Sequence, residues 1–217
     1  MSGTIAELTD NAIQLFCVFA CGSYSCFKAI AKRDYKWLLT ALFYLSFGIG
    51  LTYWVLYLVL FDSAPQVFFV SELSWTASYI FLAMRLAAGL PDDGRGVKTR
   101  LLFLVFPFFS FIMCIFFCMR GSYLENVLMG TAMAVCGFLA AKGIYLSRRG
   151  EREDSPWIFY ASLLFYAAEY ILWISSYFWI DNTFLNPYFL TDTFILNPAL
   201  ILIAFAQGRE DKICHTV

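Results

Sequence analysis

A chain of 217 residues with 61% hydrophobic and only 14% charged residues is far more apolar than a soluble protein, in which about 25% of residues are charged. The formal net charge is −1, so the charge balance gives no indication of nucleic-acid binding, and we expect no nucleic-acid partner. Together with a mean hydropathy of +0.69, this composition predicts an all-α integral membrane protein in contact with the lipid bilayer.

Seven apolar segments have about the length of 20 residues that a helix needs to cross a bilayer. In chain order we place them at 11–31, 37–61, 66–88, 100–119, 123–146, 156–180 and 185–207. Short loops join them, so we expect one seven-helix transmembrane domain over residues 1–217 and no soluble domain.

The basic residues indicate how these helices are oriented. Fourteen of the fifteen lysines and arginines lie in or beside the first, third and fifth loops and the C-terminal tail, and only Arg120 lies on the other side. Because positively charged loops stay in the cytoplasm, we expect an outside N-terminus and a cytoplasmic C-terminus in the cell membrane. The first ten residues hold Glu7 and Asp10 but no basic residue, so we expect a short outside segment and no signal peptide.

Cysteine and histidine usage argues against cofactor chemistry. None of the seven cysteines forms a C-x-x-C pair, and the single histidine, His215, lies in the tail. We therefore expect no metal, no cofactor and no disulfide. The chain also shows no Gly-rich phosphate loop and no Ser/His/Asp arrangement, so we expect that it is not an enzyme.

Short segments recur along the chain in the same order and at nearly the same spacing. The matching pairs are 21–22 with 136–137, 43–44 with 165–166, and 68–72 with 188–192. They predict a parallel 3+1+3 internal repeat, in which the fourth helix links two three-helix units of the same orientation. Glu72 and Asp192 are equivalent in this repeat.

Three carboxyl groups fall inside the predicted helices. Glu169 lies near the middle of 156–180, whereas Glu72 and Asp192 lie about six residues inside the outer ends, or roughly 9 Å deep at 1.5 Å per residue. Ionisable residues are costly in hydrocarbon, which makes each a candidate binding group. The structural alternatives are an interhelical hydrogen bond for Glu169 and placement near the outer interface for the other two.

Aromatic residues share helix faces with these acids. The candidate residues for binding a substrate or a proton are Glu169, Glu72, Asp192, Tyr53, Trp75, Tyr79, Tyr166 and Trp173. Polar side chains inside a membrane bundle turn toward its interior. We therefore expect these residues to converge on an acidic, aromatic-walled cavity that opens outward.

Seven helices, an outside N-terminus and a parallel 3+1+3 repeat resemble the SWEET and PQ-loop transporters. The resemblance covers the whole chain at the level of topology. It implies that a small solute enters between the two repeats and is passed inward as one repeat rocks on the other.

A small transporter for a polar or cationic solute is the function we expect, with Glu169 as the central binding or proton-coupling group. The alternative is a seven-helix receptor or sensor that binds a ligand in the same cavity and contacts a partner through loops 91–100 and 148–152. A lipid-modifying intramembrane enzyme is third. A homo-oligomer is compatible with each of them.

Overall fold

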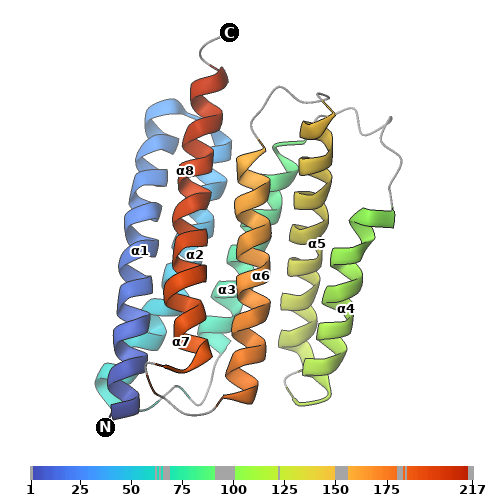
Figure 1. Cartoon of the computed structure of the whole chain (residues 1–217). Coiled ribbons are helices and arrows are strands. Elements are labelled where there is room, and N and C mark those ends of the chain that lie inside the picture. The colour runs from blue at the N-terminus through green and yellow to red at the C-terminus, as the bar shows by residue number, and fades with distance from the viewer. Residues whose placement is uncertain are drawn as a thin grey trace.

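Helices make up nearly all of the chain that the computed structural model describes, which is residues 2–61, 63, 65, 69–90, 101–121, 123–149, 156–179, 183 and 185–214 (Figure 1). The elements in chain order are α1 (Ser2–Lys32), α2 (Tyr35–Phe61), α3 (Phe69–Ala87), η1 (Leu101–Leu104), α4 (Val105–Cys118), α5 (Tyr123–Arg148), α6 (Trp157–Phe178), α7 (Pro187–Thr191), η2 (Asp192–Leu196) and α8 (Asn197–Cys214). The last three follow one another without a break.

The all-helical, membrane-type fold predicted from composition is confirmed in the described residues. Six of their helices are long and apolar enough to cross a membrane, counting η1 with α4 and α7, η2 and α8 as one helix each. The helix α3 is long enough but not apolar enough to count among them, because Glu72, Arg85 and several serines lower its hydropathy. The largest departure from the predicted ranges is in α1, which begins at Ser2 and includes residues predicted to precede the first helix.

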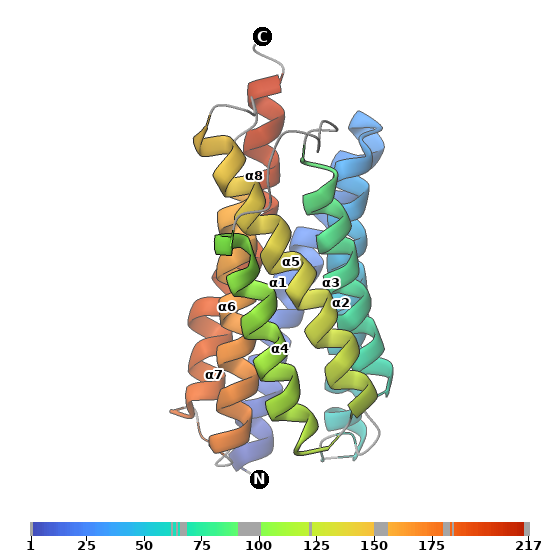
Figure 2. The same ribbon diagram turned by 90° about the vertical axis from the view of Figure 1, so that its right-hand side faces the viewer.

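The helices form a ring in which each contacts the next, in the order α1, α2, α3, α5, α6, α8 and back to α1. The helix α4 lies outside this ring and packs on α5 (Figures 1 and 2). The two termini lie at opposite ends of the bundle. We call these the N-terminal end and the C-terminal end.

Charged residues are distributed unequally between these two ends. The helices α1 and α5 finish at the C-terminal end with Lys32 and Arg148, and Arg209 lies in the last third of α8 at the same end. Arg120 follows α4 at the N-terminal end, where its guanidinium lies 3.9 Å from the ring centroid of Tyr177. Loop 91–100 and residues 150–152 of loop 148–152, the two loops considered above as docking surfaces, lie outside the described residues, as does His215.

Large apolar side chains cover the outside of the bundle. Leu101 is 82% exposed, Phe16 is 76% exposed and Phe205 is 61% exposed. A soluble monomer rarely exposes apolar patches of this extent, whereas lipid tails solvate them well. The outer surface is therefore suited to hydrocarbon.

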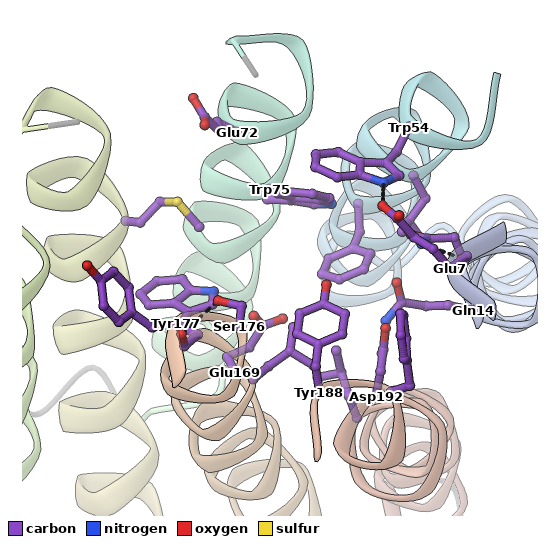
Figure 3. Close-up of a pocket in the computed structure, with 18 of the residues that line it drawn as sticks. Glu7, Gln14, Trp54, Glu72, Trp75, Glu169, Ser176, Tyr177, Tyr188 and Asp192 are labelled. Atoms are coloured by element: carbon purple, nitrogen blue, oxygen red, sulfur yellow. Dashed lines mark hydrogen bonds between the residues drawn. The ribbon is translucent and has the colours of Figure 1, made fainter. Parts of the chain in front are cut away.

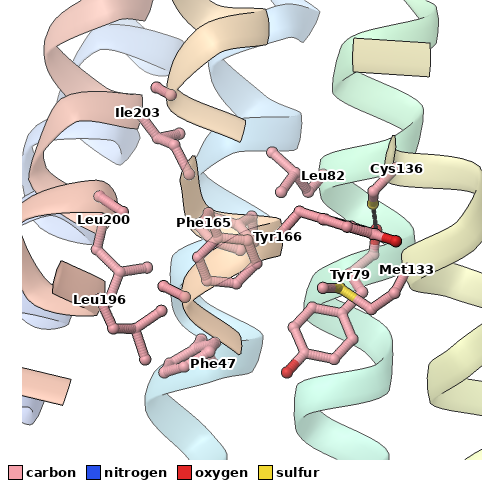
Figure 4. Packing of buried hydrophobic residues seen from close by; sticks show 14 of the residues in the cluster. Phe47, Tyr79, Leu82, Met133, Cys136, Phe165, Tyr166, Leu196, Leu200 and Ile203 are labelled. Atoms are coloured by element: carbon pink, nitrogen blue, oxygen red, sulfur yellow. Dashed lines mark hydrogen bonds between the residues drawn. The ribbon is translucent and has the colours of Figure 1, made fainter. Parts of the chain in front are cut away.

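Aliphatic and aromatic side chains together fill the interior between the middle of the bundle and its C-terminal end (Figure 4). Phe165 of α6 is fully buried, and its ring meets that of Phe43 edge-on with 5.5 Å between centroids. Closer to the C-terminal end, Gly143 lets α5 approach α6, since a Cβ atom there would lie 2.2 Å from the ring of Phe159. This part of the interior is close-packed.

Candidate functional site: an acidic cavity at the N-terminal end

A cavity of about 570 Å³ occupies the N-terminal half of the bundle (Figure 3). Its walls come from α1, α2, α3, α5, α6 and the start of the last helix, with Phe117 from α4. Five carboxyl side chains line it, those of Glu7, Glu72, Glu125, Glu169 and Asp192. The described lining residues include no lysine or arginine. The cavity therefore suits a positively charged guest far better than an anion.

Glu169 lies near the middle of α6. It is nine residues from the end of the helix at Phe178, or roughly 13 Å at 1.5 Å per residue. Its side chain is only 2% exposed and points into the cavity (Figure 3). Tyr79 and Trp173 lie beside its carboxyl group. Within the described part of the chain, its Oε1 atom has no hydrogen-bond partner. A buried polar atom without a partner is costly, and a ligand that donates to it would remove that cost.

Aromatic side chains form the walls around this carboxyl group. The rings of Trp54 and Trp75 lie 6.0 Å apart, and those of Tyr79 and Trp173 lie 6.4 Å apart. The indole of Trp75 approaches α2 closely because Gly50 has no side chain, and a Cβ atom there would be 2.7 Å from the indole Nε1. Ring faces in this arrangement attract a cation and stack on a flat ligand.

The first turns of α1 supply a polar wall that we did not predict. Glu7 accepts a hydrogen bond from Trp54 Nε1 at 2.9 Å, and Gln14 Nε2 donates to the Asp192 carboxylate (Figure 3). Glu7, Asn11 and Gln14 all line the cavity. Their spacing of four and then three residues places them on one face of a helix, a signal that would have identified them had α1 been extended to its true start.

The last helix begins with a cap and then widens. Asn186 accepts a hydrogen bond from the Tyr188 backbone N–H at 2.9 Å, which fixes the first turn. Asp192 then opens the segment η2, which is a π-helix. Wide turns of this kind occur mostly as single insertions in α-helices and often at functional sites. The π-helix ends at Leu196, directly before Asn197 and Pro198.

Six of the eight predicted site residues line the cavity, namely Glu72, Trp75, Tyr79, Glu169, Trp173 and Asp192. The other two are not among the lining residues. Tyr53 packs on Tyr57, one turn further along α2, with 6.1 Å between ring centroids. Tyr166 faces α4, where its hydroxyl group donates to the Phe106 carbonyl at 3.0 Å and lies 2.8 Å from Ser110 Oγ.

In the described residues, no group of three or more His, Cys, Asp or Glu side chains is arranged to hold a metal ion. The chain matches no protein-family model, no curated protein and no solved structure. A functional assignment therefore rests on the cavity itself, which carboxyl and aromatic side chains line together.

Proposed function

We propose that the protein is a small membrane transporter that moves an organic cation through the acidic cavity. The observation that carries this proposal is the Glu169 carboxyl group, which is 2% exposed, lies in a cavity of about 570 Å³ and has an oxygen atom without a partner among the described residues. A small ammonium compound would provide the missing donor and the missing positive charge.

Charge and shape together favour a cation with an apolar body. An isolated carboxylate in a low-dielectric site is strongly destabilised, and an ammonium group within hydrogen-bonding distance compensates for much of this cost. The faces of Trp75, Tyr79 and Trp173 favour a diffuse cation, since cation–π attraction is worth about 2 kcal/mol or more where water is excluded. A sugar would use the carboxyl groups but would leave their charge uncompensated.

The proposed transporter crosses the membrane seven times. In this proposal α3 crosses the membrane although its hydropathy is low, because α2 and α5 flank it and cover much of its surface. The N-terminal end faces outward, since the described basic residues gather at the opposite end. Solute would enter the cavity from outside, and in the predicted repeat the two units that enclose it would be α1–α3 and α5–α8.

The orientation is tested by labelling single cysteines in a cysteine-free background. Met119 is 80% exposed at the outer end of α4, and Tyr35 is 59% exposed at the start of α2, at the C-terminal end. An impermeant thiol reagent should label the variant Met119→Cys in intact cells and should label Tyr35→Cys only after the cells are opened. The reverse pattern would contradict the outward-facing cavity.

The ligand class is tested with choline and its neutral carbon isostere. Choline should raise the melting temperature of the purified protein and should be taken up by proteoliposomes, whereas the isostere should do neither. The substitution Glu169→Gln keeps the shape of the side chain and removes the charge, so it should abolish both effects while the protein remains folded. Binding of choline without uptake would indicate a receptor, and binding of the isostere with equal affinity would contradict the cation site.

A further inference from the structure

A second group of acidic residues lies beside the cavity, where α1 meets η2. Asp10 is 4% exposed and Asp192 is 2% exposed, and their carboxyl groups are within hydrogen-bonding reach of each other. Each also accepts a hydrogen bond from a neutral side chain. Thr193 Oγ1 donates to Asp10 Oδ1 at 2.9 Å, and Gln14 Nε2 donates to Asp192 Oδ1.

No basic residue in the described part of the chain is among the groups that interact with this pair. The titratable side chains that face it are Glu7 and Cys17 from α1, Glu169 from α6 and Tyr188 from α7. All four are acids, so none can compensate for two adjacent negative charges. Two buried carboxyl groups in contact under these conditions bind a proton between them, because both cannot ionise together.

Two unsatisfied polar groups mark the same region. Asp10 Oδ2 has no hydrogen-bond partner among the described residues, and it is the atom left available for a proton shared with Asp192. Asn197, the residue that follows η2, is 4% exposed, and both polar atoms of its side chain also lack a described partner. The segment therefore has unused hydrogen-bonding capacity on both sides of the wide π-turn.

The same pairing of acids occurs a second time in the ring. Glu72 of α3 interacts with Glu125 of α5, and both side chains are half-buried. The segment Asp10-Asn11 is separated from Glu125-Asn126 by the same distance along the chain that separates Cys21-Gly22 from Cys136-Gly137. Glu72 and Asp192 are equivalent in the predicted repeat. The pair of Asp10 and Asp192 therefore corresponds to the pair of Glu125 and Glu72.

We propose that Asp10 and Asp192 form a proton-binding site, distinct from the cation site at Glu169, that couples transport to protons. The shared proton joins α1 to η2. Its release leaves two carboxylates that repel each other across this contact and loosens the cavity wall that contains Gln14 and Asp192. The coupling step rests on the proposed function. One organic cation moves inward for each proton that moves outward, so no net charge crosses the membrane.

The proton site can be tested without any ligand. Infrared difference spectra of the purified protein at neutral pH should show the C=O stretching band of a protonated carboxyl group when either Asp10→Asn or Asp192→Asn is subtracted from the wild type. The matched control is Asp34→Asn in the turn between α1 and α2, whose carboxylate is half-buried and accepts a hydrogen bond from the Lys36 backbone N–H at 2.9 Å. Its difference spectrum should lack the band.

Two results would overturn the proton site. One is the full carboxylic-acid absorption remaining in both Asp10→Asn and Asp192→Asn. The other is thermal stability that depends on sodium concentration at constant ionic strength and is lost in both variants, since this would identify a metal cation between the two carboxyl groups.

Coupling is measured separately, as the ratio of choline uptake with and without a proton gradient directed out of the proteoliposomes. The ratio should be several-fold in the wild type and should fall to one in Asp10→Asn, whose side chain is not among those lining the cavity. An unchanged ratio in Asp10→Asn would overturn the coupling. If choline is not transported at all, the proposed function fails, whereas the infrared result still decides whether the pair holds a proton.

Discussion

Phe165 and Glu169 lie one turn apart on α6 and are both buried, yet their surroundings differ completely. The rings of Phe43, Phe47 and Tyr79 surround Phe165 at centroid distances of 5.5 to 6.3 Å. Glu169 instead borders a cavity of about 570 Å³ and keeps an oxygen atom without a partner among the described residues. One half of the bundle is thus packed to hold the helices together, and the other is hollow and available to a ligand.

The largest expected effect is in the packed half. Phe165→Ala should lower the free energy of unfolding by about 3–5 kcal/mol, because the closely packed rings cannot collapse into the space left behind. The comparison is Phe117→Ala, whose side chain lines the cavity. Denaturant unfolding in detergent micelles should show a clearly smaller loss for Phe117→Ala, and equal losses would mean that the two halves are packed alike.

A smaller effect is expected from adding one methyl group in each half. Gly143→Ala would place Cβ 2.2 Å from the Phe159 ring, which should cost about 1–3 kcal/mol of stability, since α5 and α6 must separate. In Gly50→Ala the Trp75 indole can instead move into the cavity. We expect a smaller change in melting temperature for Gly50→Ala, together with weaker choline binding. Equal destabilisation by both would show that Trp75 has no room to move.

The smallest expected effects have opposite signs in the two halves. Tyr166→Phe removes the hydroxyl group that bonds to Ser110 and Phe106, which should cost about 0.6–1.7 kcal/mol, the range for hydrogen bonds between membrane helices. Glu169→Leu removes a buried oxygen without a described partner, so it should raise stability by about 1 kcal/mol. Thermal unfolding of both variants checks this. A destabilised Glu169→Leu variant would indicate that Glu169 is an interhelical contact.

The sequence predicted well those features that depend on one helix alone, such as its limits and the residues that share one of its faces. Except at the start of α1 and the end of α8, apolar runs located the helix ends to within a few residues. Helical spacing identified residues of shared faces, namely Glu72, Trp75, Tyr79, Glu169 and Trp173. The spacing of residues along one helix could not show which other helix each face contacts. Tyr166 therefore shares a predicted face with Glu169 but contacts α4, and Tyr53 contacts Tyr57.

The polar wall from α1 was missed for a different reason. Glu7 and Asp10 lower the local hydropathy, so the first helix was predicted to begin after them, whereas α1 begins at Ser2. Their burial depends on partners far away in the chain. Trp54 donates to Glu7, and Thr193 donates to Asp10. Polar residues of this kind are found within a bundle only when another helix provides their hydrogen bonds.

By itself, the sequence determined that the helices are suited to a lipid environment and approximately where they begin and end. Hydropathy and helical length are local properties of the chain. The tertiary structure alone decided which polar side chains face one another. The pairing of Asp10 with Asp192 joins positions near the two ends of the chain, and the free Glu169 oxygen exists because the neighbouring helices leave space beside it. Both depend on how the helices pack in the ring, and helix packing is set by all of their faces together.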